Sequence, residues 1–175
     1  MATTKKTAKH KTAPKRPTKR ATPAVATPKP ATALVLRTCD AERRAYGGFV
    51  WPESGLVECP DWHPRAECGN GLHGLLWGEG DGGLLSWEPN ALWLVVEVEA
   101  GAIVELCGKV KFPRGVVVYC GTRETATAYV AERRPGAAIT GGTATAGYAG
   151  TATAGARGTA TAGDAGTATA GDAGT

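Results

Sequence analysis

Long apolar runs are missing from this sequence of 175 residues. A membrane-spanning helix needs a run of about 18 apolar residues or more, and none occurs, so we expect no transmembrane helix. No apolar segment follows the lysines near the N-terminus, which argues against a secretory signal peptide. Phosphate-binding loops, Walker patterns and Gly-x-Ser-x-Gly elbows are also absent, so the common catalytic motifs give no support for an enzyme.

Acidic residues are absent from residues 1–33, although this segment holds nine of the twenty lysines and arginines. Interspersed prolines and the lack of apolar periodicity predict a disordered basic tail. It resembles the Lys/Ala/Pro tails of linker-histone-like proteins, and counterion release would let it bind nucleic acid or another polyanion. A solubilising arm without a partner is the alternative. The candidate polyanion-binding residues are Lys5, Lys6, Lys9, Lys11, Lys15, Arg16, Lys19 and Arg20.

Cysteine is present in an odd number, five, and the chain is not a tiny disulfide scaffold. This usage favours reduced thiols, and therefore predicts a cytoplasmic protein.

Residues 34–136 form the part of the chain that can build a conventional core. Short apolar segments predict strands at 34–36, 49–51, 55–59, 92–98, 103–106, 109–112 and 116–120. Residues 92–98 are almost continuously apolar, which indicates a central strand. Thr122 is a candidate N-cap for a helix over 124–134, which Pro135-Gly136 would end. The prediction is an α+β domain with a small, mostly antiparallel sheet and a C-terminal helix.

The middle of that domain contains several residues with chemical potential. Cys59, His63, Cys68 and His73 include the ligand types that zinc prefers, but their spacing is not that of the known zinc knuckles. We expect no metal and no cofactor, with the cysteines packed as small apolar residues. A Cys68–His73 thiolate–imidazole pair, or a metal-dependent site, is the weaker alternative of an enzyme.

Residues 142–175 repeat the octad Gly-Thr-Ala-Thr-Ala-Gly-x-x without slippage. Such a fixed period predicts a repeat architecture. Alternation places the threonines on one face of each strand and the alanines on the other, and the glycines supply turns. We therefore expect a short β-solenoid over 140–175, with two octads in each coil of about 16 residues. Units one and three would share one face, and units two and four the opposite face.

The octads resemble the tandem repeats of bacterial ice-nucleation proteins, which carry Thr-x-Thr followed by Ala-Gly and often Tyr. The resemblance, placed on residues 142–175, implies a solenoid whose threonine rows order water. The water-ordering residues would be Thr143, Thr145, Thr151, Thr153, Thr159, Thr161, Thr167 and Thr169. A disordered Gly/Ala/Thr tail is the alternative.

The domain of residues 34–136, called the head below, also resembles a family of uncharacterised bacterial and phage domains. The matching residues are Trp51-Pro52, Asp61-Trp62 and Glu67 to His73. The resemblance implies only that such a domain can precede repeat tracts. A short solenoid needs a cap at its end, and the head is the candidate.

Two functional hypotheses follow. The first is a non-enzymatic structural protein that acts through its threonine surface and through self-association. The second is a nucleic-acid-associated protein anchored by its tail. Gly174-Thr175 interrupts an octad, so we expect either a piece of a longer repeat protein or a last strand that pairs with a partner.

Overall fold

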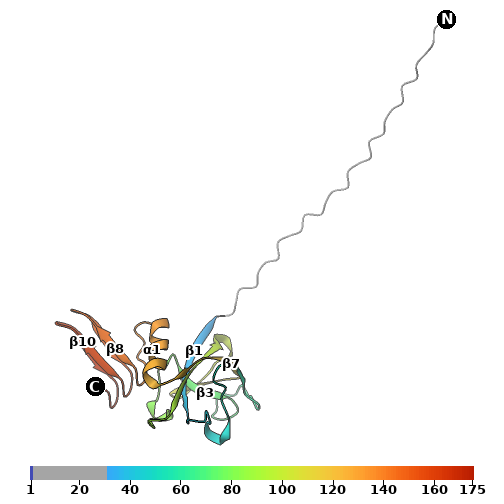
Figure 1. Ribbon diagram of the computed structural model, residues 1–175, viewed down its shortest axis with the longest axis horizontal. Helices are drawn as coiled ribbons and strands as arrows, with labels where there is room; N and C mark the ends of the chain where they lie inside the picture. Colours follow the sequence, from blue (N-terminus) through green and yellow to red (C-terminus); the bar gives the residue numbers. More distant parts are fainter. Residues whose placement is uncertain (2–30) are drawn as a thin grey trace.

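The computed structural model describes Met1 and residues 31–175, so the candidate polyanion-binding residues lie outside the described part of the chain (Figure 1). The head is a seven-stranded sheet in the order β2-β7-β4-β1-β3-β6-β5, and its strand pairs are antiparallel. The strands are β1 (Thr32–Cys39), β2 (Gly55–Glu58), β3 (Leu72–Leu76), β4 (Leu92–Glu99), β5 (Val104–Leu106), β6 (Lys109–Phe112) and β7 (Arg114–Gly121). The expectation of a mostly antiparallel sheet is confirmed.

β4 is an interior strand, between β7 and β1. Its continuous apolar run is explained by burial on both faces of the sheet. Leu94 and Val96 belong to one core cluster, whereas Trp93 and Val95 belong to a second cluster on the other face. Leu94, Val95 and Val96 have no exposed surface, and burying each such side chain contributes about 1.5–3 kcal/mol.

One α-helix, α1 (Arg123–Arg133), is found in the described part of the chain, close to the predicted bounds. The side chain of Thr122 accepts a hydrogen bond from the amide of Thr125, so Thr122 is the N-cap as expected. Ala126 and Val130 pack into the second core cluster, against β4, β7 and β1. With 11 residues, α1 is too short to cross a membrane, and no other helix of residues 31–175 is long and apolar enough.

One strand prediction in the head was wrong, and one strand was missed. Residues 49–51 form no strand: a 3-10 turn, η1 (Tyr46–Gly48), precedes them, and Val50 makes a single isolated bridge with Arg44. Trp51 instead turns inward and is 1% exposed. Conversely, β3 was not predicted, yet it lies between β1 and β6. Short 3-10 turns η2 (Gly82–Leu84) and η3 (Ala100–Ala102) complete the head.

The repeat tract forms four short strands, β8 (Thr143–Ala146), β9 (Thr151–Ala154), β10 (Thr159–Ala162) and β11 (Thr167–Ala170). β8 pairs in parallel with β10, and β9 pairs in parallel with β11. Each pair joins residues sixteen positions apart, which is the length of two octads. The tract is therefore ordered into two parallel two-stranded sheets.

The head contacts the first octads directly. In Figure 1, α1 lies beside β8, on the side away from β10. Residues 134–142 form the linker between α1 and β8. The amide of Thr140 donates to the carbonyl of Gly78 at 2.9 Å, which ties this linker to the head. The amide of Gly155 donates to the carbonyl of Ile139 at 3.1 Å, which ties the same linker to the tract. Hydrogen bonds thus join the tract to the head through this linker.

Candidate functional site: the threonine rows

The threonines of the octads face solvent. Seven of the eight are exposed, and Thr153 is half-buried. The intervening alanines are less exposed than the threonines: Ala152 and Ala154 are buried, and only Ala168, in the last strand, is exposed. This alternation follows from the period of two in an extended strand.

Register places the threonines of paired strands opposite one another. Thr143 pairs with Thr159 and Thr145 with Thr161 on one face, and the equivalent pairs on the other face are Thr151 with Thr167 and Thr153 with Thr169. Paired strands lie about 4.8 Å apart, and alternate residues of a strand about 6.8 Å apart. Each face therefore presents a two-by-two block of hydroxyl and methyl groups.

Each octad turn contains a residue with left-handed backbone geometry. Ala149, Arg157, Ala165 and Ala173 have φ values of 52°, 53°, 58° and 54°. These residues recur every eight positions, at the second variable position of each octad. The turns are therefore alike although their side chains differ.

The same turn geometry begins before the first octad. Gly141, eight residues before Ala149, has φ of 69°. Its amide donates to the carbonyl of Ala156, fifteen residues ahead, just as the amide of Ala149 donates to the carbonyl of Asp164. The linker thus supplies a turn in register with those of the tract.

Arg157 ties a turn of the tract to the head. Its guanidinium lies 4.8 Å from the ring centre of Trp87, in a cation–π contact. Trp87 is held in turn by a hydrogen bond from its indole nitrogen to the carbonyl of Gly82, at 2.8 Å. A residue that varies between octads is therefore used for docking onto the head.

The four Cys and His candidates do not form a metal cluster in the described part of the chain. Cys59 donates to Asp61, and burial raises the pKa of its thiol. Cys68 and His63 are exposed, and the Nδ1 atom of His63 accepts from the amide of Arg65. The expectation that these residues bind no zinc stays a prediction.

Sequence reasoning missed two cations of the head. Lys111 is 1% exposed, and its Nζ atom donates to the carbonyls of Glu67 and Gly69 at 2.8 and 3.3 Å, which fastens the 61–71 loop to β6. Arg37 lies with its guanidinium 3.9 Å from the ring centre of Trp51. The only sequence signal for either residue was a charge within an apolar strand.

The chain is similar to curated ice nucleation proteins. It is 46% identical to one from Pseudomonas fluorescens over 101 residues, which is 57% of this chain and 8% of that protein. It is 42% identical to ice nucleation protein InaU of Pantoea ananas over 103 residues, 58% of this chain and 10% of that protein. A third relative, from Xanthomonas campestris pv. translucens, is 43% identical over 110 residues, 61% of this chain and 7% of that protein.

These similarities span a tenth or less of the length of each relative. No protein-family profile matches the chain, and no solved structure matches it. The 101 aligned residues are about three times the length of the octad tract, so limiting the resemblance to residues 142–175 was too narrow. The similarity of this chain to ice nucleation proteins extends beyond the repeats and includes residues of the head.

Proposed function

We propose that this chain is the head and first coils of an ice-nucleation-like structural protein, and that it acts through its threonine rows and not as an enzyme. The observation that carries the proposal is the in-register pairing of Thr-x-Thr strands, with their threonine side chains toward solvent. The similarity to ice nucleation proteins supports it.

The finer proposal is that further octads continue the two sheets into a solenoid. Inter-coil hydrogen bonds support this geometry. The amide of Thr159 donates to the carbonyl of Gly142 at 2.9 Å, and that of Thr167 donates to Gly150 at 2.8 Å. Both bonds span the same seventeen residues, so the coil can be repeated without a change of register. Stability of such an array grows with each neighbouring interface.

The head would act as the template that starts this solenoid. Its linker supplies the in-register turn at Gly141, and Arg157 docks on Trp87. A repeat array needs such a cap because its first coil has no neighbour to cover its edge. Self-association through the tract, polyanion binding by residues 1–33 and a cytoplasmic location stay predictions.

Droplet freezing tests the proposal. Each face of the present tract has only four threonines, so an ordered water patch on it is very small. We expect droplets of this chain to freeze no warmer than buffer. A variant lengthened by many octads should freeze at clearly higher temperature, because the ordered patch grows with every coil.

The matched control is an equally long tract in which the second threonine of each octad is replaced by alanine. It keeps length and β structure, checked by circular dichroism, but removes half of every Thr-x-Thr pair. It should freeze colder than the all-threonine tract. If the all-threonine tract has β structure and freezes no warmer than buffer, the rows do not act as an ice template.

A further inference from the structure

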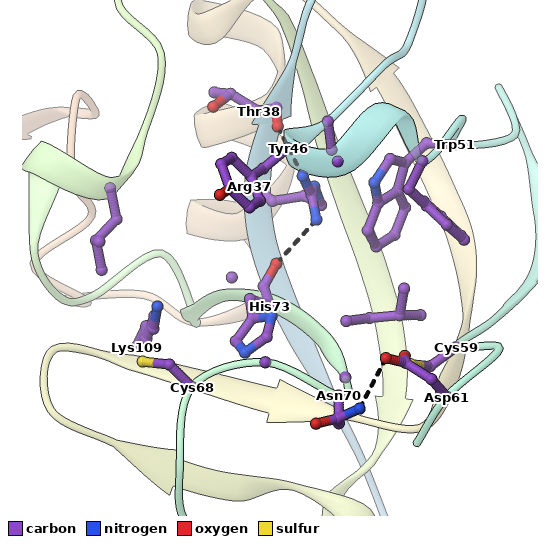
Figure 2. A pocket seen from close by; sticks show the side chains of 18 of the residues that line it. Arg37, Thr38, Tyr46, Trp51, Cys59, Asp61, Cys68, Asn70, His73 and Lys109 are labelled. Atoms are coloured by element: carbon purple, nitrogen blue, oxygen red, sulfur yellow. Dashed lines mark hydrogen bonds between the residues drawn. The ribbon is translucent and has the colours of Figure 1, made fainter. Parts of the chain in front are cut away.

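The head contains a half-open cavity of about 740 Å³ that the threonine rows do not involve. It lies between β1 and β3, the η1 turn and the 59–61 and 68–71 loops, as Figure 2 shows. Its size is within the range of small-molecule sites, which is about 300–1,000 Å³. The residues that give it chemical character are Arg37, Tyr46, Trp51, Asp61, His73 and Lys109.

Three buried polar atoms of the residues that line this cavity have no hydrogen-bond partner among the described residues. They are Nε of Arg37, Nε1 of Trp51 and Nε2 of His73. An unpaired buried polar group of this kind is destabilising, and native structures contain few of them. Three at one cavity therefore point to a ligand that supplies the missing partners.

Two of these atoms belong to neighbouring donors. The Arg37 guanidinium stacks on Trp51 at 3.9 Å, and Figure 2 shows the indole nitrogen on the side facing Arg37. Nη1 and Nη2 of Arg37 donate to the carbonyls of His73 and Thr38, at 3.2 and 3.0 Å. These two bonds fix the guanidinium and leave its Nε–H free. An acceptor oxygen would satisfy the unpaired N–H groups of Arg37 and Trp51.

The cavity favours a single negative charge. Burial lowers the pKa of Arg37 to about 10, so the guanidinium stays positive at neutral pH, and Lys109 adds a second cation. The opposing carboxylate, Asp61, is engaged by Asn70 at 2.8 Å and by the thiol of Cys59 at 3.0 Å. The unpaired N–H groups of Arg37 and Trp51 are few for the three oxygens of a phosphate, and the charge of Asp61 would repel a dianion. A carboxylate therefore fits the cavity better than a phosphate.

The rest of the lining suits an apolar group. Phe49, Leu72, Leu84 and Leu85 contribute to the walls, and Leu84 is an exposed large apolar residue. Tyr46 is fully exposed on the η1 turn at the rim. Large apolar side chains left exposed beside polar donors are typical of ligand sites.

We propose that this cavity binds a small organic carboxylate with an apolar body. The carboxylate accepts from Nε of Arg37 and Nε1 of Trp51, and the apolar body lies against Phe49 and Leu84. Lys109 supplies long-range attraction, and Nε2 of His73 offers a further hydrogen bond. Because the Arg37 and Trp51 nitrogens are buried, the cavity wall beside them, which includes the η1 turn, must shift to admit the carboxylate.

The test uses the full chain and 4-phenylbutyrate as the probe, with the neutral amide 4-phenylbutanamide as the matched control. The assigned indole N–H signal of Trp51 is followed by NMR during titration. We expect a saturable shift with the carboxylate and about tenfold weaker binding of the amide, because the amide lacks the charge. The bound anion should also raise the pKa of His73, measured from its ring proton.

Two variants locate the site. Lys109→Gln removes a half-buried charge at the cavity and should weaken binding about fivefold. Arg114→Gln removes an exposed charge outside the cavity and should leave binding unchanged. No saturable shift, equal binding of the amide, or equal weakening by the two variants would each overturn the proposal. None of these results bears on the freezing test, because neither substitution touches the threonine rows.

Discussion

Each octad turn contains one residue with left-handed backbone geometry. Replacing alanine by glycine should therefore have opposite effects in a turn and in the strand before it. Ala165 has φ of 58°, in the region that glycine favours. Ala162, three residues earlier, lies in strand β10 with ordinary extended geometry. We expect Ala165→Gly to stabilise the tract and Ala162→Gly to destabilise it.

The magnitudes follow from two opposing terms. Left-handed geometry costs a residue with a β-carbon about 1–2 kcal/mol, and glycine removes this cost. Glycine also gains freedom in the unfolded chain, which costs about 0.5–1 kcal/mol of stability. The net expectation at Ala165 is a gain of about 0.5–1 kcal/mol. At Ala162 the left-handed term is absent and a half-buried methyl group is also lost, so the expectation is a loss of at least about 0.5–1 kcal/mol.

Amide hydrogen exchange measures the effect locally. The amides of Gly166 and Thr167 donate to Gly163 and Gly150 at 2.9 and 2.8 Å, beside the altered turn. Their exchange should slow about two- to fivefold in Ala165→Gly and accelerate by a similar factor in Ala162→Gly. Both variants replace one alanine by glycine, so they differ only in the position of the change. Equal acceleration of exchange in both would refute the argument that the turns are strained.

Three further predictions concern the head and the tail. A β-carbon on Gly74 would lie 2.5 Å from Cγ1 of Val35, so Gly74→Ala should destabilise the head by about 1–3 kcal/mol; an unchanged Tm would contradict this. The pKa of His73 is lowered, first by burial and then by Lys109 and other cations, so the folded state favours the neutral imidazole. The free energy of unfolding should therefore fall as pH drops below 6.5, the ordinary pKa of histidine. In His73→Gln, urea unfolding should show a smaller fall in this free energy between about pH 7 and pH 5. Duplex DNA binding should weaken steeply with salt and vanish when residues 1–33 are deleted; binding that survives the deletion would contradict the tail hypothesis.

Local sequence rules located the elements whose determinants are close in the chain. The helix could be predicted because Thr122 caps it and Pro135-Gly136 follows it. The octad strands could be predicted because threonine and alanine alternate with the period of a strand. β4 could be recognised as interior because its apolar run has no polar face.

β3 could not be predicted, because Leu72–Leu76 contains a histidine and a glycine within five residues. Gly74 is required by tertiary packing, where the strand passes close to Val35 and the carbonyl of Leu36. The strand expected at 49–51 was lost for a similar reason. Burial of Trp51 beneath Arg37 takes precedence over the local preference of Phe49-Val50-Trp51 for extended pairing.

The sequence alone determined the repeat, its period and the side of each strand that carries threonine, since these depend on spacing along the chain. Tertiary structure decided which strands pair in the head, where the linker turn at Gly141 enters the register of the octads, and that Arg157 rests on Trp87. It also decided that Arg37, Trp51 and His73 meet at one cavity. These contacts join residues far apart in sequence, and their free energy depends on burial and packing that no local pattern records.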